Sequence, residues 1–223
     1  MSENNENKTG IDNRKLSKAE QRRKENFEKT EKDLTGKGYK RTDLTISVIK
    51  ANTIGVLITL PLMAVVCIFY IVINGGLVDA GKTPWPEYLN FWIFIISTVL
   101  LVVIHEGIHG LCWSFGAPNH LKDIEFGFIA QMLTPYATCK APLSKPLYII
   151  GSLMPMTLLG IIPGIICAFF GNITLLGIFI IQVLGGSGDF LISLMLIKYK
   201  TKGKDVVILD HPYECGLVVF EKV

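Results

Sequence analysis

Three ionisable residues, His105, Glu106 and His109, lie in an otherwise apolar stretch of the sequence. On a helix, residues four positions apart share a face, so the two imidazoles can bind one metal ion while Glu106 lies beside them. A zinc ion held in this way lowers the pKa of a bound water toward neutrality, and a neighbouring carboxylate can take its proton. The pattern predicts hydrolytic metal chemistry, with His105 and His109 as ligands and Glu106 as catalytic base.

A chance origin of this spacing is a poor explanation, because the composition makes His-Glu-x-x-His expected in roughly 0.3% of such sequences. The alternative is structural: the three side chains would be satisfied by polar groups of neighbouring helices. Ionisable residues within membrane-spanning helices are expensive and mark functional sites by default. The metal site is therefore the favoured interpretation.

The composition is that of a membrane protein. Half of the 223 residues are hydrophobic, mean hydropathy is +0.43 and only 18% are charged. Charge is concentrated at the start, where residues 1–53 carry thirteen of the twenty-two Lys and Arg. We expect a charged cytoplasmic arm over 1–37, a membrane domain over 38–204 and a cytoplasmic tail with short strands over 205–223.

The arm contains good helix formers, and Ser17-Lys18-Ala19-Glu20 fits a capping box. Its apolar residues, Leu16, Phe27 and Leu34, are too few to bury a face well, so we expect a solvated helix or a partly disordered segment. Acidic residues are interleaved with the basic ones, which argues against a nucleic-acid partner. The polar first residues predict no cleavable signal peptide.

Four apolar segments of about 20 residues are long enough to cross a bilayer. They cover 54–73, a stretch beginning near 91 that contains the histidine pair, 147–170 and 174–197. Lys and Arg gather before the first segment, between the second and third, and after the fourth. The positive-inside rule then predicts a multi-pass protein of the cell membrane, in contact with the lipid bilayer, with both termini in the cytoplasm.

Short alternating patterns predict strands outside these segments. They occur near Leu44, between 122 and 140, at 206–209 and at 217–220. The two in the tail can pair with the strand near Leu44, and a hairpin over 122–140 can hold an extended peptide at its edge. The fold class predicted is an all-α membrane protein with four transmembrane helices and a small β element on the cytoplasmic side.

A catalytic zinc needs a third protein ligand, and Asp189 is the candidate. His105 lies fourteen residues after the outer start of its segment and Asp189 fifteen after its own, so both reach a depth of about 21 to 22 Å. Two neutral histidines, one aspartate, a hydroxide and Zn²⁺ sum to zero charge, which suits low dielectric. Gly185, Gly186 and Gly188 allow close helix approach or local loosening, although plain helix packing explains them equally well.

Other residues are weaker ligand candidates. Cys112 follows His109 by three positions and can reach the same face, but buried cysteine usually behaves as a small hydrophobe. His211 and His120 lie in polar segments, where a solvated histidine is the simpler interpretation. Gln182, seven residues before Asp189, is a candidate oxyanion stabiliser or, more simply, a buried packing residue.

With these residues identified, the sequence resembles the "putative zincin peptidase" family of small bacterial membrane proteins and is similar to the intramembrane site-2 protease clan. The resemblance rests on His-Glu-x-x-His-Gly, the strand region that follows and the late Gly-Asp, and it extends from residue 38 to the C-terminus. It implies zinc bound by His105, His109 and Asp189, Glu106 as catalytic base, and a peptide or membrane-protein substrate. Gly-Gly-Ser-Gly-Asp-Phe around Asp189 departs from the site-2 protease pattern.

Three functions of different classes follow. The first is a membrane-embedded zinc metalloprotease, and the second is a non-proteolytic membrane protein that binds or transports a divalent metal; a scaffold with a vestigial motif is a third. Transport needs ligands but has no use for a base next to His105, so Glu106 favours hydrolysis. The sequence does not indicate an oligomeric state.

Overall fold

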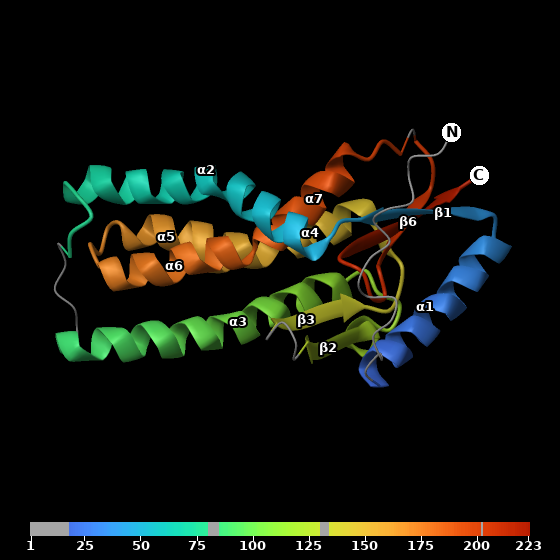
Figure 1. The fold of residues 1–223 in the computed structure, drawn as a ribbon, viewed down its shortest axis with the longest axis horizontal. Helices are drawn as coiled ribbons and strands as arrows, with labels where there is room; N and C mark the ends of the chain where they lie inside the picture. The colour runs from blue at the N-terminus through green and yellow to red at the C-terminus, as the bar shows by residue number, and fades with distance from the viewer. Residues whose placement is uncertain (1–17, 80–84, 130–133, 202) are drawn as a thin grey trace.

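A computed structural model describes residues 18–79, 85–129, 134–201 and 203–223 of the protein. In Figure 1 long helices lie side by side along the long axis, and the strands gather toward one end together with α1. The C-terminus lies at that end, while the connection from α5 to α6 lies at the other. Ser17, where the predicted capping box begins, is outside the described residues.

The apolar segments form the expected helices. They are α2 (Val48–Asn74), α3 (Asn90–Ser114, preceded by the short helix η1, Glu87–Leu89), and α4 (Lys145–Met156), which continues through a π-helical turn (η3, Thr157–Ile161) into α5 (Ile162–Cys167). Among the described residues, three helices are long and apolar enough to cross a membrane. Large side chains such as Val72 and Val103 are exposed on them, 74% and 63% respectively, which suits an apolar solvent.

The fourth segment is not one straight helix. It consists of α6 (Ile173–Gly185) and α7 (Ser187–Lys198), which meet at a bend of 42° and count as a fourth span only if the bent pair crosses as one. Glycine permits this packing: a Cβ on Gly186 would lie 2.7 Å from Cβ of Met156, and one on Gly55 of α2 would lie 3.0 Å from the Ser187 carbonyl oxygen. The bend therefore lies where α6 and α7 meet α4 and α2 closely.

A four-stranded antiparallel sheet joins distant parts of the chain. Its strands, β1 (Tyr39–Thr45), β6 (Gly216–Lys222), β5 (Val206–Asp210) and β4 (Leu143–Ser144), lie in that order. Leu44 is opposite Leu217, so the predicted pairing of the tail with the strand near Leu44 is confirmed. The predominantly helical fold with a small β element is confirmed as well. The sheet also includes β4, from the segment before α4.

The N-terminal helix α1 (Lys18–Gly36) packs against this sheet. Phe27 and Leu34 are only 7% and 6% exposed and lie in a cluster with Leu209, Val218 and Phe220. The segment is a helix, one of the two predicted alternatives, but the expectation that its apolar residues are too few to bury a face well was wrong for Phe27 and Leu34. Residues seven apart lie two turns apart on one side of a helix, and two large side chains are enough when the partner is an apolar sheet.

The predicted hairpin over 122–140 is present as β2 (Ile124–Ile129) and β3 (Thr134–Cys139), which follow a short 3₁₀ helix, η2 (His120–Asp123). It lies alongside the C-terminal half of α3 in Figure 1. A Cβ on Gly110 would lie 2.5 Å from the Phe126 ring, so glycine lets the hairpin approach α3 directly after His109. The hairpin therefore flanks the histidine pair.

Candidate metal centre

His105 and His109 lie one turn apart on α3 and face inward. They are 7% and 3% exposed, and their ring centroids are 4.8 Å apart. The four-residue spacing on a regular helix is what brings two imidazoles to one side. Both rings therefore reach the same point between α3 and its neighbours.

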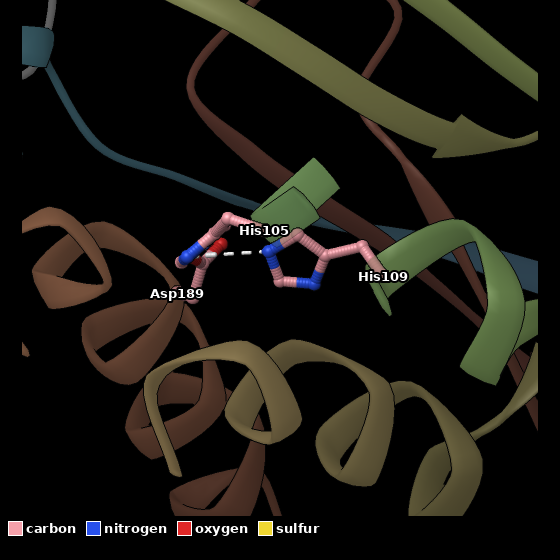
Figure 2. Close-up of side chains that lie close together, drawn as sticks. All are labelled: His105, His109 and Asp189. Atoms are coloured by element: carbon pink, nitrogen blue, oxygen red, sulfur yellow. Dashed lines mark hydrogen bonds and ion pairs between the residues drawn. The ribbon is translucent and has the colours of Figure 1, made fainter. Parts of the chain in front are cut away.

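Asp189 meets both histidines from the first turn of α7. Its Oδ2 lies 3.3 Å from Nε2 of His105 and 3.4 Å from Nε2 of His109. One ligand atom from each residue fits within 4.8 Å of the others, and Figure 2 shows the three side chains converging from the two helices. The structure thus brings together the three residues predicted as ligands.

A backbone contact orients His109. Its Nδ1 lies 2.9 Å from the carbonyl oxygen of Gly151 on α4. A carbonyl can only accept, so Nδ1 carries the proton and, in a neutral ring, Nε2 presents a lone pair. This is the arrangement in which metal-binding histidines are usually held.

When the His109 ring is neutral, two acceptors face each other, because its bare Nε2 lies 3.4 Å from the carboxylate Oδ2 of Asp189. Such a pair is unfavourable in a buried setting unless a proton or a cation lies between them. Two imidazoles and one carboxylate make the three-ligand set of a catalytic zinc, with a fourth position left open. The donor set and its geometry fit a zinc ion.

Aromatic stacking fixes the plane of the His109 ring. His109 stacks on Trp113 with centroids 5.0 Å apart, and Trp113 stacks on Tyr148 at 5.5 Å. The Trp113 indole N–H donates to the Tyr148 carbonyl at 3.3 Å. A Cβ on Gly151 would overlap the indole of Trp113, so this glycine allows α4 to come close.

These supporting residues were missed at the sequence level. Trp113 stands four positions after His109, which places it on the same face, and that spacing was the available signal. Gly151 is one of several glycines in apolar helices, and nothing local distinguishes it. Its role depends on a contact between residues forty-two positions apart.

Glu106 lies beside the cluster without being part of it. Its side chain is partly buried, and its carboxylate accepts a hydrogen bond from the backbone N–H of Ala137 on β3. Glu106 therefore connects the histidine helix to the hairpin. A carboxylate that is held next to the three candidate ligands, yet is not one of them, is suited to proton transfer.

The weaker candidates lie elsewhere. Within the described residues, His105, His109 and Asp189 are the group suited to a metal, and it excludes Cys112, His120 and His211. Nδ1 of His120 faces the Ser114 carbonyl at 3.2 Å, and Nδ1 of His211 accepts from the Glu214 N–H at 2.9 Å. Gln182 is buried on α6 at 2% exposure, and its suggested oxyanion role stays a prediction.

Comparison with protein-family models gave a match to part of the chain. Residues 98–203 match the family described as "putative zincin peptidase", so the resemblance predicted from the sequence is confirmed over this range. The matched range includes His105, Glu106, His109, the hairpin and Asp189. Comparisons with curated proteins and with solved structures gave no match.

Proposed function

We propose, starting from the zincin peptidase match over residues 98–203, that this protein is a membrane-embedded zinc metalloprotease. His105, His109 and Asp189 hold the zinc ion, and Glu106 is the general base. The observation that carries the proposal is the convergence of Asp189 Oδ2 on both histidine Nε2 atoms, at 3.3 and 3.4 Å. The family description implies zinc dependence and peptide-bond hydrolysis.

The residues of the chain have separate tasks in this reaction. When bound, a zinc ion supplies a Lewis acid that polarises the scissile carbonyl and makes a water molecule acidic enough to attack near neutral pH. Glu106 accepts the proton of the attacking water and returns it to the leaving amine. The N–H of Ala137 holds the Glu106 carboxylate in place, and Gly151 holds His109 in the tautomer that leaves Nε2 bare.

The hairpin suggests how a substrate is held. A helical substrate is a poor one, because its peptide groups are hydrogen-bonded within the helix. The two-stranded sheet of β2 and β3 leaves an edge of β3 without a partner strand among the described strands, and Ala137 on β3 contacts Glu106. We infer that a peptide, or an unwound segment of a membrane protein, binds in extended form at an edge of this hairpin by strand addition. On β3 the backbone carbonyls are the groups available to it, because the N–H groups of Ala137 and Cys139 already bond Glu106 and Asp210.

The proposed setting is the cell membrane. α2, α3 and α4 with α5 cross it, and the bent pair of α6 and α7 crosses as a fourth span, which its length and apolar composition allow. Both termini, the sheet and the hairpin belong to the cytoplasmic side, in agreement with the distribution of Lys and Arg. In this arrangement the bend before Asp189 brings the carboxylate to the depth of His105.

The proposal is tested by separating metal binding from cleavage. Purified protein should contain about one zinc per chain, and His105→Ala with His109→Ala should abolish it. Glu106→Gln should keep the zinc and trap membrane proteins or peptides that wild type does not accumulate, because glutamine cannot accept the proton. If Glu106→Gln cleaves a confirmed substrate as fast as wild type does, the protease mechanism is wrong and the metal-binding or transport alternative replaces it.

A further inference from the structure

Asp210, at the end of β5 in the C-terminal tail, accepts hydrogen bonds from two distant parts of the chain. Its Oδ1 accepts from the Tyr148 hydroxyl of α4 at 2.5 Å, and its Oδ2 accepts from the Thr138 hydroxyl of β3 at 2.5 Å. The backbone N–H of Cys139 is a third donor. One carboxylate thus joins the tail sheet, the hairpin and α4.

The surroundings of Asp210 indicate a structural joint. Asp210 keeps some exposed surface. Burial of its carboxyl group nevertheless raises the pKa above the ordinary value, and the hydrogen bonds from the three donors act in the opposite direction. Hydrogen bonds of hydroxyl groups to a carboxylate are short and about twice as strong as neutral ones. A carboxylate enclosed in this way holds its partners in one geometry.

The first partner, Tyr148, leads to the metal ligands. Its ring is 4% exposed and stacks on Trp113, which stacks on His109. The Tyr148 carbonyl also accepts the indole N–H of Trp113. Asp210 therefore fixes the far end of an aromatic column whose near end is the His109 imidazole.

The second partner, Thr138, leads to the proposed base. Thr138 is 8% exposed and directly follows Ala137, whose N–H holds the Glu106 carboxylate. Side chains of successive strand residues point to opposite faces of the sheet. A hydrogen bond that holds the Thr138 hydroxyl on one face therefore also fixes the position of the neighbouring Ala137 relative to Glu106. Asp210 thereby limits how far β3 can move relative to α3.

We propose that Asp210 is a positioning residue that sets the His109 ligand through Tyr148 and the Glu106 base through Thr138. This inference rests on the proposed zinc-protease function. It assigns to the C-terminal tail a part in the site, although Asp210 touches neither the ligands nor the base.

The first test compares two aspartates of the same sheet region. Asp210→Asn removes one acceptor oxygen of the joint. Asp205→Asn is the matched control, because Asp205 Oδ2 also accepts from a tyrosine hydroxyl at 2.5 Å, that of Tyr39, but at an exposed position without a path to the ligands. The measurements are zinc affinity by competition with a chelator and the visible absorption spectrum of the Co²⁺-loaded protein.

Asp210→Asn should weaken zinc binding about tenfold, the lower end of the effect of removing a residue that supports metal ligands, and should change the Co²⁺ spectrum. Asp205→Asn should do neither. Zinc affinity and a Co²⁺ spectrum in Asp210→Asn equal to those of Asp205→Asn would overturn the inference while leaving the proposed function intact. Absence of zinc binding by wild type would overturn both.

The second test separates the two arms and does not depend on Asp210→Asn folding. Tyr148→Phe keeps the stacked ring but removes the hydroxyl, and should alter the Co²⁺ spectrum and the zinc affinity. Thr138→Val keeps the shape but removes the other donor, and should preserve zinc affinity while lowering kcat and shifting the pH profile of cleavage. Loss of zinc affinity in both variants, or in neither, would contradict the two-arm assignment.

Non-additivity provides the last check. When two residues act through one hydrogen bond, either substitution alone removes that bond, so the effects of the two substitutions do not add. In an Asp210→Asn background, Tyr148→Phe should therefore change zinc affinity less than it does in wild type. Full additivity of the two changes would show that Asp210 does not act through Tyr148.

Discussion

Nδ1 of His109 donates to the carbonyl oxygen of Gly151 at a distance of 2.9 Å. This contact links α3, which carries two of the proposed ligands, to α4, which carries none. A backbone carbonyl cannot turn away as a side chain can, so the ligand tautomer is set by how closely the two helices pack. Small residues at the contact therefore matter as much as the ligands.

The first prediction follows from that packing. Gly151→Ala should weaken zinc binding about tenfold or more and destabilise the fold by about 1 to 3 kcal/mol, because the new Cβ overlaps the Trp113 indole and forces α4 away from His109. Zinc content and thermal unfolding in detergent are the measurements. Gly185→Ala is the control, since nothing lies within 4 Å of a Cβ there, and it should bind zinc as wild type does.

The second prediction distinguishes ligand from base. Asp189→Asn should lower zinc occupancy, because it removes the anionic ligand that offsets the charge of the ion in a low-dielectric site. Glu106→Gln should keep zinc and lose about 10²- to 10⁴-fold in cleavage rate. Equal loss of zinc in the two variants would make Glu106 a ligand. Cys112→Ser serves as the control and should change neither quantity, since Cys112 is outside the cluster.

The third prediction concerns α1. Phe27→Ala should reduce the free energy of unfolding by about 3 kcal/mol, because Phe27 is buried against Val218 and Phe220. Lys29→Ala, an exposed change on the same helix, should stay within about 0.5 kcal/mol of wild type. Equal stability of the two variants, measured by denaturant unfolding in detergent, would mean that α1 is not docked on the sheet in solution.

The site was more predictable from the sequence than its support. His105, Glu106 and His109 follow from helical periodicity, which is a local property, and Asp189 follows from counting residues along two helices that enter from the same side. Strand pairing in the tail was accessible for a similar reason, since alternation marks a strand wherever it lies. These inferences need only the periodicity of residues within one helix or strand and the rise per residue of an α-helix.

What could not be predicted depends on contacts between distant residues. The burial of Phe27 needs the face of a sheet assembled from both ends of the chain, and the bend after Gly185 depends on Met156 and Gly55 packing opposite it. Likewise, nothing in the neighbourhood of Asp210 in the sequence points to Tyr148 or Thr138. Tertiary partners decide such features, and propensity carries little information about them.

The fourth prediction concerns pH and His211. Burial, as the largest cause, lowers the pKa of His211 below its ordinary value of 6.5, with Arg41 acting in the same direction and Glu214, Asp43 and Glu31 opposing. The unfolded chain then binds more protons than the folded one, so His211 contributes stability that is present above about pH 6.5 and is lost as pH falls through the lower folded pKa.

Thermal unfolding between pH 8 and pH 5 provides the measurement. Wild type should lose more stability on acidification than His211→Asn, whose side-chain oxygen can still accept the Glu214 N–H but does not titrate. The comparison removes the contribution of the other histidines, which both proteins share. A wild-type curve parallel to that of the variant would show that His211 has an unshifted pKa.

The last prediction is topological and uses accessibility to a reagent that does not cross the membrane. All five native cysteines are free thiols, so a variant lacking them supplies the background. Asp79 follows the end of α2 in the chain, and Lys204 precedes the start of β5. A cysteine at position 79 should react from outside intact cells, and one at 204 should react only after the membrane is opened, because basic residues stay in the cytoplasm. If α6 and α7 cross as one span, three spans separate the two positions, which then lie on opposite sides of the membrane. If the bent pair turns back, only two spans separate them, and both positions lie on the same side. Labelling of both positions from outside would therefore show that the bent pair turns back instead of crossing, and labelling of 204 alone would reverse the orientation.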